Sequence, residues 1–111
     1  MNFLKLDERV WVAAQLEPDD LSAVVAQGFR TIICNRPDNE GPAQPSFAQI
    51  KGAALAGGLE AVYIPIVPGQ AGLAEVGAFA DAIKRQPGPV LAYCRSGARS
   101  KAIYDAVRSM A

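Results

Sequence analysis

Short apolar runs alternate along the chain with segments in which apolar residues recur every three or four positions. The runs are rich in β-branched and aromatic residues, which favours strands, and the segments between them have the period of amphipathic helices. Strands are predicted over 10–14, 29–34, 90–93 and within 59–67 (AVYIPIV), and helices over 18–27, 47–56, 73–85 and 99–110. This alternation predicts an α/β fold with a mostly parallel central sheet flanked by helices. Residues 2–6 are expected to pair with the first strand as an N-terminal edge hairpin.

The ends of these elements are marked by residues with special backbone preferences. Ser46 and Gln49 have the spacing of a capping box at the start of a helix. Pro65 has no backbone N–H, so the strand predicted over 59–67 must lie at an edge of the sheet or end there. The helix over 73–85 is expected to bury a stripe formed by Leu73, Val76, Ala80 and Ile83.

The composition is that of an ordinary globular domain. The 111 residues are 50% hydrophobic and 20% charged, with eleven basic and eleven acidic side chains. We expect a single domain over residues 1–111. The even charge balance argues against nucleic acid or a membrane surface as a partner. The N-terminus lacks the apolar stretch of a signal peptide, so a cytoplasmic location is expected.

The chain contains no histidine, and its two cysteines, Cys34 and Cys94, lie far apart in the sequence. These facts exclude Ser-His-Asp and Cys-His catalysis, histidine zinc sites and CxxC metal knuckles. We therefore expect neither a metal site nor a cofactor. Chemistry at this protein must use cysteine, carboxylates, lysine, arginine, serine or tyrosine.

The strongest candidate site follows the strand predicted over 90–93. There Cys94 ends the strand, Gly97 permits a sharp turn, and a helix begins near Arg99. In such a loop, backbone N–H groups and the helix N-terminus converge on one point and bind an anion. The predicted anion-binding residues are Arg95, Ser96, Gly97, Ala98 and Arg99.

The same surroundings should activate a thiol. A cysteine beside arginine at a helix N-terminus has a lowered pKa and is a nucleophile near neutral pH, which makes Cys94 the predicted catalytic residue. Cys34 lies within an apolar strand and is expected to be a small buried hydrophobic residue. Because both cysteines end strands at one sheet edge, a reversible disulfide between them is a further hypothesis.

These residues resemble known families. The run Cys94-Arg95-Ser96-Gly97-Ala98-Arg99 resembles the active-site loop of rhodanese-type sulfurtransferases and also that of tyrosine and dual-specificity phosphatases. Together with the segments 20–21, 28–33, 35–40, 63–65 and 88–97, it resembles the bacterial family called beta-lactamase hydrolase-like protein, phosphatase-like domain. The resemblance implies a dual-specificity-phosphatase-like fold with catalytic Cys94 and anion-binding Arg99. By this resemblance, the Ser100 hydroxyl aids departure of the thiolate, but serine is equally a residue that starts helices.

The chain departs from the phosphatase pattern in three ways. Four residues separate Cys94 from Arg99 where phosphatases have five, Tyr93 stands where they usually have histidine, and segment 66–72 lacks their acidic residue. A general acid would have to come from Asp38 or Glu40, in the loop after another strand. Arg36, in the same loop, is either a second anion clamp or part of a salt bridge that fixes the loop.

Three functions remain open at this stage. The favoured one is a cysteine-dependent phosphatase-like hydrolase with a thiophosphate intermediate on Cys94. The second is a sulfurtransferase that carries a persulfide on Cys94, and the third is a catalytically weak module that binds oxyanions or a partner. The expected ligand is a small anion or a phosphorylated or persulfidated group. The sequence does not indicate an oligomeric state.

Overall fold

A computed structural model of the protein describes residues 2–110 and contains one five-stranded sheet. The strands are β1 (Leu4–Lys5), β2 (Val10–Ala13), β3 (Thr31–Cys34), β4 (Glu60–Tyr63) and β5 (Val90–Tyr93). Their order across the sheet is β1-β2-β5-β3-β4, and all neighbours are parallel except β1 and β2. The predicted mostly parallel sheet and its N-terminal edge hairpin are confirmed.

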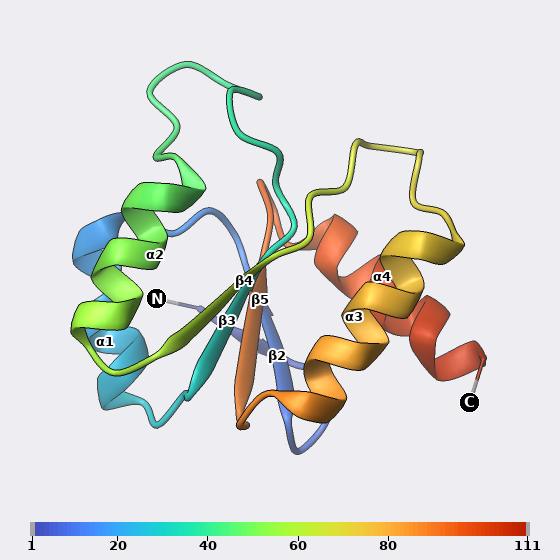
Figure 1. Ribbon diagram of the computed structural model, residues 1–111, viewed down its shortest axis with the longest axis horizontal. Coiled ribbons are helices and arrows are strands. Elements are labelled where there is room, and N and C mark those ends of the chain that lie inside the picture. Colours follow the sequence, from blue (N-terminus) through green and yellow to red (C-terminus); the bar gives the residue numbers. More distant parts are fainter. Residues whose placement is uncertain (1, 111) are drawn as a thin grey trace.

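Helices cover both faces of this sheet (Figure 1). They are α1 (Leu21–Ala26), preceded by a 3₁₀ turn over Pro18–Asp20, α2 (Phe47–Ala56), α3 (Leu73–Arg85) and α4 (Ala98–Ser109). One face carries α1 and α2 and the other carries α3 and α4, each over its own apolar cluster. Within residues 2–110, no helix is long and apolar enough to cross a membrane.

The predicted capping residues act as expected. Ser46 Oγ accepts a hydrogen bond from Gln49 N at 3.2 Å, and Gln49 Oε1 accepts one from Ser46 N at 2.9 Å. Strand β4 ends at Tyr63, before Pro65, and lies at the edge of the sheet. The pattern of local hydrogen bonding therefore decides these boundaries, as the sequence indicates.

The predicted apolar stripe of α3 is wrong at its first position. Leu73 is 80% exposed, whereas the helix buries Phe79 and Ala82, with Val76 and Ile83 partly buried beside them. Leu73 in the first turn of α3 therefore lies outside the apolar cluster that the rest of the helix covers. Periodicity alone does not reveal where the covering layer ends.

The loops that leave the carboxyl ends of β3, β4 and β5 rise on the same side of the molecule (Figure 1). Ligands bind at this edge in open parallel α/β sheets. The fold therefore brings segments 35–46, 64–72 and 94–97 together.

Candidate active site

The loop between β5 and α4 surrounds the Cys94 thiol. Cys94 is fully buried, and its Sγ accepts a hydrogen bond from Gly97 N at 3.1 Å. Gly97 has a φ of +94° and precedes the first residue of α4. A Cβ at this position would lie 3.4 Å from the carbonyl oxygen of Ala13, so the tight turn favours glycine on two grounds.

Backbone donors lower the pKa of the Cys94 thiol. Burial alone would raise that pKa, but the backbone N–H groups of Ser100, Ser96, Arg99 and Gly97 outweigh it. Four donors thus stabilise the thiolate, as a nucleophile at neutral pH requires.

Ala98 contributes less to the group of backbone donors around the thiol than we expected. Its N–H is directed to the Ser96 hydroxyl at 3.4 Å, because that short side chain folds back over the turn. The exposed side chain of Ser96 therefore accepts a hydrogen bond within the turn, while its backbone N–H stabilises the thiolate.

Arg99 is oriented by two acceptors. Its Nη1 and Nη2 donate to the two carboxylate oxygens of Glu40 at 2.7 and 2.6 Å, and Nη1 also donates to the Ile66 carbonyl at 2.8 Å. Hydrogen bonds with Glu40 raise the pKa of Arg99 most, burial opposes the rise, and the nearby Cys94 adds to it. Among the described residues, the Nε–H and the second Nη2 N–H have no acceptor at hydrogen-bond distance, and both lie on one edge of the guanidinium.

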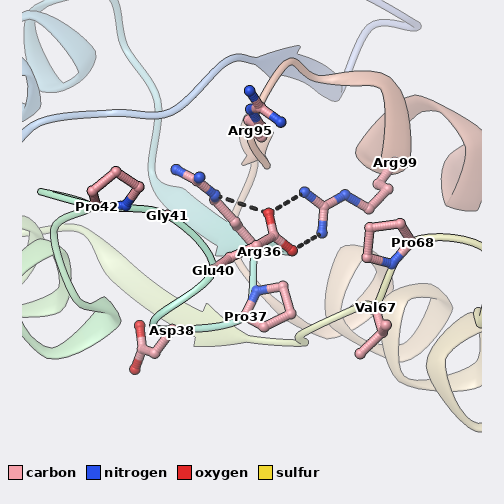
Figure 2. A pocket seen from close by; sticks show the side chains of 10 residues that line it. All are labelled: Arg36, Pro37, Asp38, Glu40, Gly41, Pro42, Val67, Pro68, Arg95 and Arg99. Atoms are coloured by element: carbon pink, nitrogen blue, oxygen red, sulfur yellow. Dashed lines mark hydrogen bonds and ion pairs between the residues drawn. The ribbon is translucent and has the colours of Figure 1, made fainter.

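Glu40 holds two arginines at once and cannot supply a proton. Besides Arg99, it accepts a hydrogen bond from Arg36 Nε at 3.0 Å (Figure 2). The hydrogen bonds from Arg99, followed by those from Arg36, lower the pKa of Glu40 to about 2 despite some burial. This lowered pKa argues against the expected role of Glu40 as a general acid, because such an acid must carry a proton at the working pH.

Arg36 fixes the loop after β3. Its side chain is largely buried, and Nη1 donates to Gln15 Oε1 at 3.1 Å in addition to the bond with Glu40. Of the two roles expected for Arg36, this geometry corresponds to the salt bridge that fixes the loop.

Asp38 caps a helix and turns away from the arginines. Its Oδ1 accepts a hydrogen bond from Phe47 N, at the start of α2, at 2.8 Å. Its own N–H donates to the Tyr63 hydroxyl at 2.9 Å. In Figure 2 the carboxylate points away from Glu40 and Arg99. One oxygen of the carboxylate is thus engaged at the start of α2, which argues against the expected acid role.

Ser100 belongs to a buried polar network that sequence reasoning missed. Its hydroxyl donates to Asn35 Oδ1 at 2.8 Å, and Asn35 Nδ2 donates to the Ile64 carbonyl at 3.0 Å. Asn35 and Ser100 are both fully buried. A polar residue directly after a buried strand was the available signal, but its partner, 65 residues away, could not be inferred.

Tyr93 and Cys34 face the core rather than the site. Both belong to the apolar cluster beneath α1 and α2, and they are register partners on neighbouring strands. Burial raises the pKa of each of these side chains. The Cys34 thiol donates to the Arg36 carbonyl at 3.3 Å. The prediction that Cys34 is a buried strand residue is confirmed, and both cysteines are free thiols.

A cavity of about 790 Å³ opens above this loop (Figure 2). Its lining combines three arginines with apolar walls. The residues are Arg36, Pro37, Asp38, Glu40, Gly41, Pro42, Val67, Pro68, Arg95 and Arg99.

The parallel sheet, the loop around a buried thiol and its neighbouring arginine define a phosphatase-like domain with a tyrosine-phosphatase-like fold. The family model named beta-lactamase hydrolase-like protein, phosphatase-like domain, matches residues 2–111, and the chain belongs to this family.

Two curated relatives are named beta-lactamase hydrolase-like protein. The protein from Agrobacterium fabrum is 36% identical over 104 residues, and that from Xylella fastidiosa (strain Temecula1) is 33% identical over the same length. Each match covers 94% of this chain but only 24% of the relative. The chain thus spans about a quarter of the length of these relatives.

Solved structures share the fold. The crystal structure of a candidate phosphatase, NMA1982 from Neisseria meningitidis, is 38% identical, with a TM-score of 0.85 over 91% of this chain and 72% of that one. The catalytic core of the Saccharomyces cerevisiae PP-IP phosphatase Siw14, solved with citrate, is 12% identical, with a TM-score of 0.67 over 98% and 75%. Pseudomonas aeruginosa TpbA, solved with phosphotyrosine, is 17% identical, with a TM-score of 0.60 over 86% and 54%.

Proposed function

We propose that the protein hydrolyses phosphate monoesters through a thiophosphate intermediate on Cys94. The observation that carries this proposal is the buried Cys94 thiol, which accepts a hydrogen bond from Gly97 N at 3.1 Å at the start of α4, one turn from the oriented side chain of Arg99. Membership in a phosphatase-like family supports it. The capture of citrate and phosphotyrosine by structural neighbours is consistent with a small anionic substrate.

The free edge of Arg99 is suited to the substrate. Because Glu40 and Ile66 occupy the other N–H groups, the Nε–H and the remaining Nη2 N–H form a fixed fork. Two parallel N–H donors match two oxygens of a phosphoryl group. Donors fixed before the reaction stabilise charge as it develops, without a cost in reorganisation.

The reaction has two displacement steps. The Cys94 thiolate attacks phosphorus, a sulfur–phosphorus bond forms, and the bond to the leaving oxygen breaks, with its electron pair staying on that oxygen. Water then attacks phosphorus, the sulfur–phosphorus bond breaks, and the thiolate returns as inorganic phosphate and a proton are released. The same N–H groups that lower the thiol pKa stabilise the departing thiolate, including the backbone N–H of Ser100.

The leaving oxygen receives its proton from water. Glu40 is ionised and Asp38 caps α2, so neither carboxylate in the cavity lining is a suitable donor. Substrates with good leaving groups, such as aryl esters, should therefore react much faster than alkyl esters. Asp38→Asn keeps an oxygen that accepts from Phe47 N, so we expect it to retain the rate and its pH dependence.

The test compares an aryl phosphate assay for the parent chain, Cys94→Ser and Cys34→Ser. Cys94→Ser should lose about 10³-fold or more of the rate, because serine is not ionised near neutral pH. Cys34→Ser is the matched control, since it alters the other buried cysteine, and it should keep most of the rate per folded molecule. Equal rates for the parent and Cys94→Ser would overturn the proposal.

A sulfurtransferase is the second candidate, and loop length favours it. Four residues between Cys94 and Arg99 make a smaller ring than five, and a single sulfur atom needs less room than a phosphoryl group. The thiolate would attack the outer sulfur of thiosulfate, the sulfur–sulfur bond would break, and sulfite would leave. Cyanide or another thiol would then take that sulfur from the Cys94 persulfide and restore the thiolate.

One assay separates the two candidates. The protein receives thiosulfate and cyanide in one vessel and an aryl phosphate in another, each beside Cys94→Ser. Thiocyanate formation without ester hydrolysis would replace the phosphatase proposal by the sulfurtransferase. If neither substrate turned over while oxyanions still raised the melting temperature, an anion-binding module would replace both.

A further inference from the structure

One arginine of the cavity has a free charged group. Arg95 is exposed and lines the cavity, and within residues 2–110 its guanidinium has no hydrogen-bond or ion-pair partner. Arg36 and Arg99, by contrast, share the carboxylate of Glu40. Figure 2 shows Arg95 apart from that cluster, on the side opposite to Asp38.

Neither carboxylate of the lining, Asp38 or Glu40, pairs with Arg95. Glu40 accepts from two arginines, and Asp38 accepts from the start of α2. An unpaired guanidinium at the mouth of a cavity raises the local concentration of anions and gains most from a partner shielded from water.

The backbone of Arg95 is held in place beside the nucleophile. Its carbonyl accepts a hydrogen bond from Gln15 N at 3.2 Å, and its Cα lies one residue, about 3.8 Å, from that of Cys94. The side chain therefore begins one residue from Cys94 and lines the same cavity as Arg99. A group a few bonds away from the bound phosphoryl group lies within its reach.

We propose that the substrate carries a second anionic group, a carboxylate or a phosphate, which Arg95 binds while Arg99 holds the reacting phosphoryl group. This inference rests on the proposed phosphatase function and adds the substrate class. The same cavity has apolar lining residues, Pro37, Pro42, Val67 and Pro68, which favour an apolar portion in the substrate. Arg95 is a specificity-determining residue, distinct in its task from Arg99.

Binding of two matched esters tests this inference without requiring turnover. The probes are 4-carboxyphenyl phosphate and 4-carbamoylphenyl phosphate, which have the same shape and differ by one negative charge. Their dissociation constants are measured by calorimetry on the full chain carrying Cys94→Ser. We expect the carboxylate ester to bind about fivefold to tenfold more tightly.

Two further variants show which arginine produces the preference. Adding Arg95→Gln should bring the ratio of the two dissociation constants close to one. Arg30→Gln is the matched control, because Arg30 is also exposed but lies before β3, at the opposite edge of the sheet. It should keep the preference.

The outcomes distinguish this inference from the phosphatase proposal. Tight but equal binding of both esters would overturn the role of Arg95 and leave the phosphatase proposal standing. A preference that survives Arg95→Gln, or that Arg30→Gln also removes, would likewise overturn it. A preference that depends on Arg95 supports the inference even if the active protein hydrolyses neither ester, in which case only the phosphatase proposal fails. Absence of binding by either ester would overturn both.

Discussion

Glu40 and Arg99 lie 59 residues apart in the sequence and form a bidentate ion pair, with Nη to Oε distances of 2.7 and 2.6 Å. Glu40 belongs to the loop after β3, and Arg99 lies in the first turn of α4. The pair leaves one edge of the guanidinium facing the candidate site. In the proposed reaction Glu40 is thus a positioning residue, which would act on the substrate through Arg99.

Glu40→Gln should reduce kcat/KM for an aryl phosphate by about tenfold to a hundredfold, because Arg99 is then free to turn away from its productive orientation. The measurement is steady-state kinetics with kcat and KM separated. Glu60→Gln, an exposed change at the start of β4, is the control and should have little effect. An unchanged kcat/KM in Glu40→Gln would contradict the positioning role.

Glu40 should also contribute to stability in acid. Its pKa in the folded protein is about 2, below the usual value near 4.3, so the folded state favours the ionised form. The resulting stabilisation is fully present above the usual carboxyl pKa and is lost as the pH falls towards 2. The difference in free energy of unfolding between the parent and Glu40→Gln, on the order of 1–3 kcal/mol at neutral pH, should shrink over that range. A constant difference would contradict the prediction.

The bond between Ser100 and Asn35 should couple the start of α4 to the end of β3. Ser100→Ala leaves the Asn35 oxygen buried without its donor, which should cost about 1–3 kcal/mol of unfolding free energy. A double-mutant cycle with Asn35→Ala, measured by urea denaturation, should give a coupling energy of about 0.5–3 kcal/mol. Strictly additive effects would show that the two side chains do not stabilise each other.

The thiols of Cys94 and Cys34 should ionise in different pH ranges. Backbone donors lower the pKa of Cys94, whereas burial raises that of Cys34. Ultraviolet absorbance of the thiolate, followed against pH, should show one early transition that disappears in Cys94→Ser and persists in Cys34→Ser. The rate of ester hydrolysis should rise with pH through that same transition, because the thiolate is the reacting form. An early transition that survives Cys94→Ser would refute this assignment.

Gly97→Ala should damage the loop. A positive φ costs an L residue about 1–2 kcal/mol, and the new methyl would press on the Ala13 carbonyl. Because Gly97 N also donates to Cys94 Sγ, the thiol pKa should rise as the turn is displaced. Ala98→Gly tests the neighbouring position, whose N–H is not among the donors to the thiol, and it should leave that pKa nearly unchanged. If the Cys94 thiol of Gly97→Ala titrated as it does in the parent protein, the turn geometry would not be the cause of the lowered pKa.

Local sequence predicted the elements that depend on local interactions. The bounds of α3 and β5 follow from apolar period and flanking proline and glycine, and the Ser46 and Gln49 cap follows from their spacing. The anion-binding loop from Cys94 to Arg99 could also be predicted from the sequence, because the N–H groups around the thiol all come from neighbouring residues. Each of these features is decided within a few residues of the chain.

The roles of side chains in the long loop after β3 could not be predicted from local sequence. Asp38 and Glu40 were equivalent acid candidates by sequence, yet one caps α2 and the other holds two arginines. Which partner a carboxylate meets depends on how the loop returns over the sheet. Sequence alone offers no distance between Glu40 and Arg99.

The sequence by itself therefore determined the alternation of elements and the turn around Cys94, the proposed nucleophile, because short-range sterics and hydrogen bonding specify these features. Only the tertiary structure decided that Glu40 orients Arg99, that Asn35 holds Ser100, and that Arg95 remains free in the cavity. These relationships depend on strand order, which places β3 beside β5 and so brings distant loops to one edge. Which side chains form ion pairs and hydrogen bonds then depends on their proximity in space, and this proximity does not follow from their order along the chain.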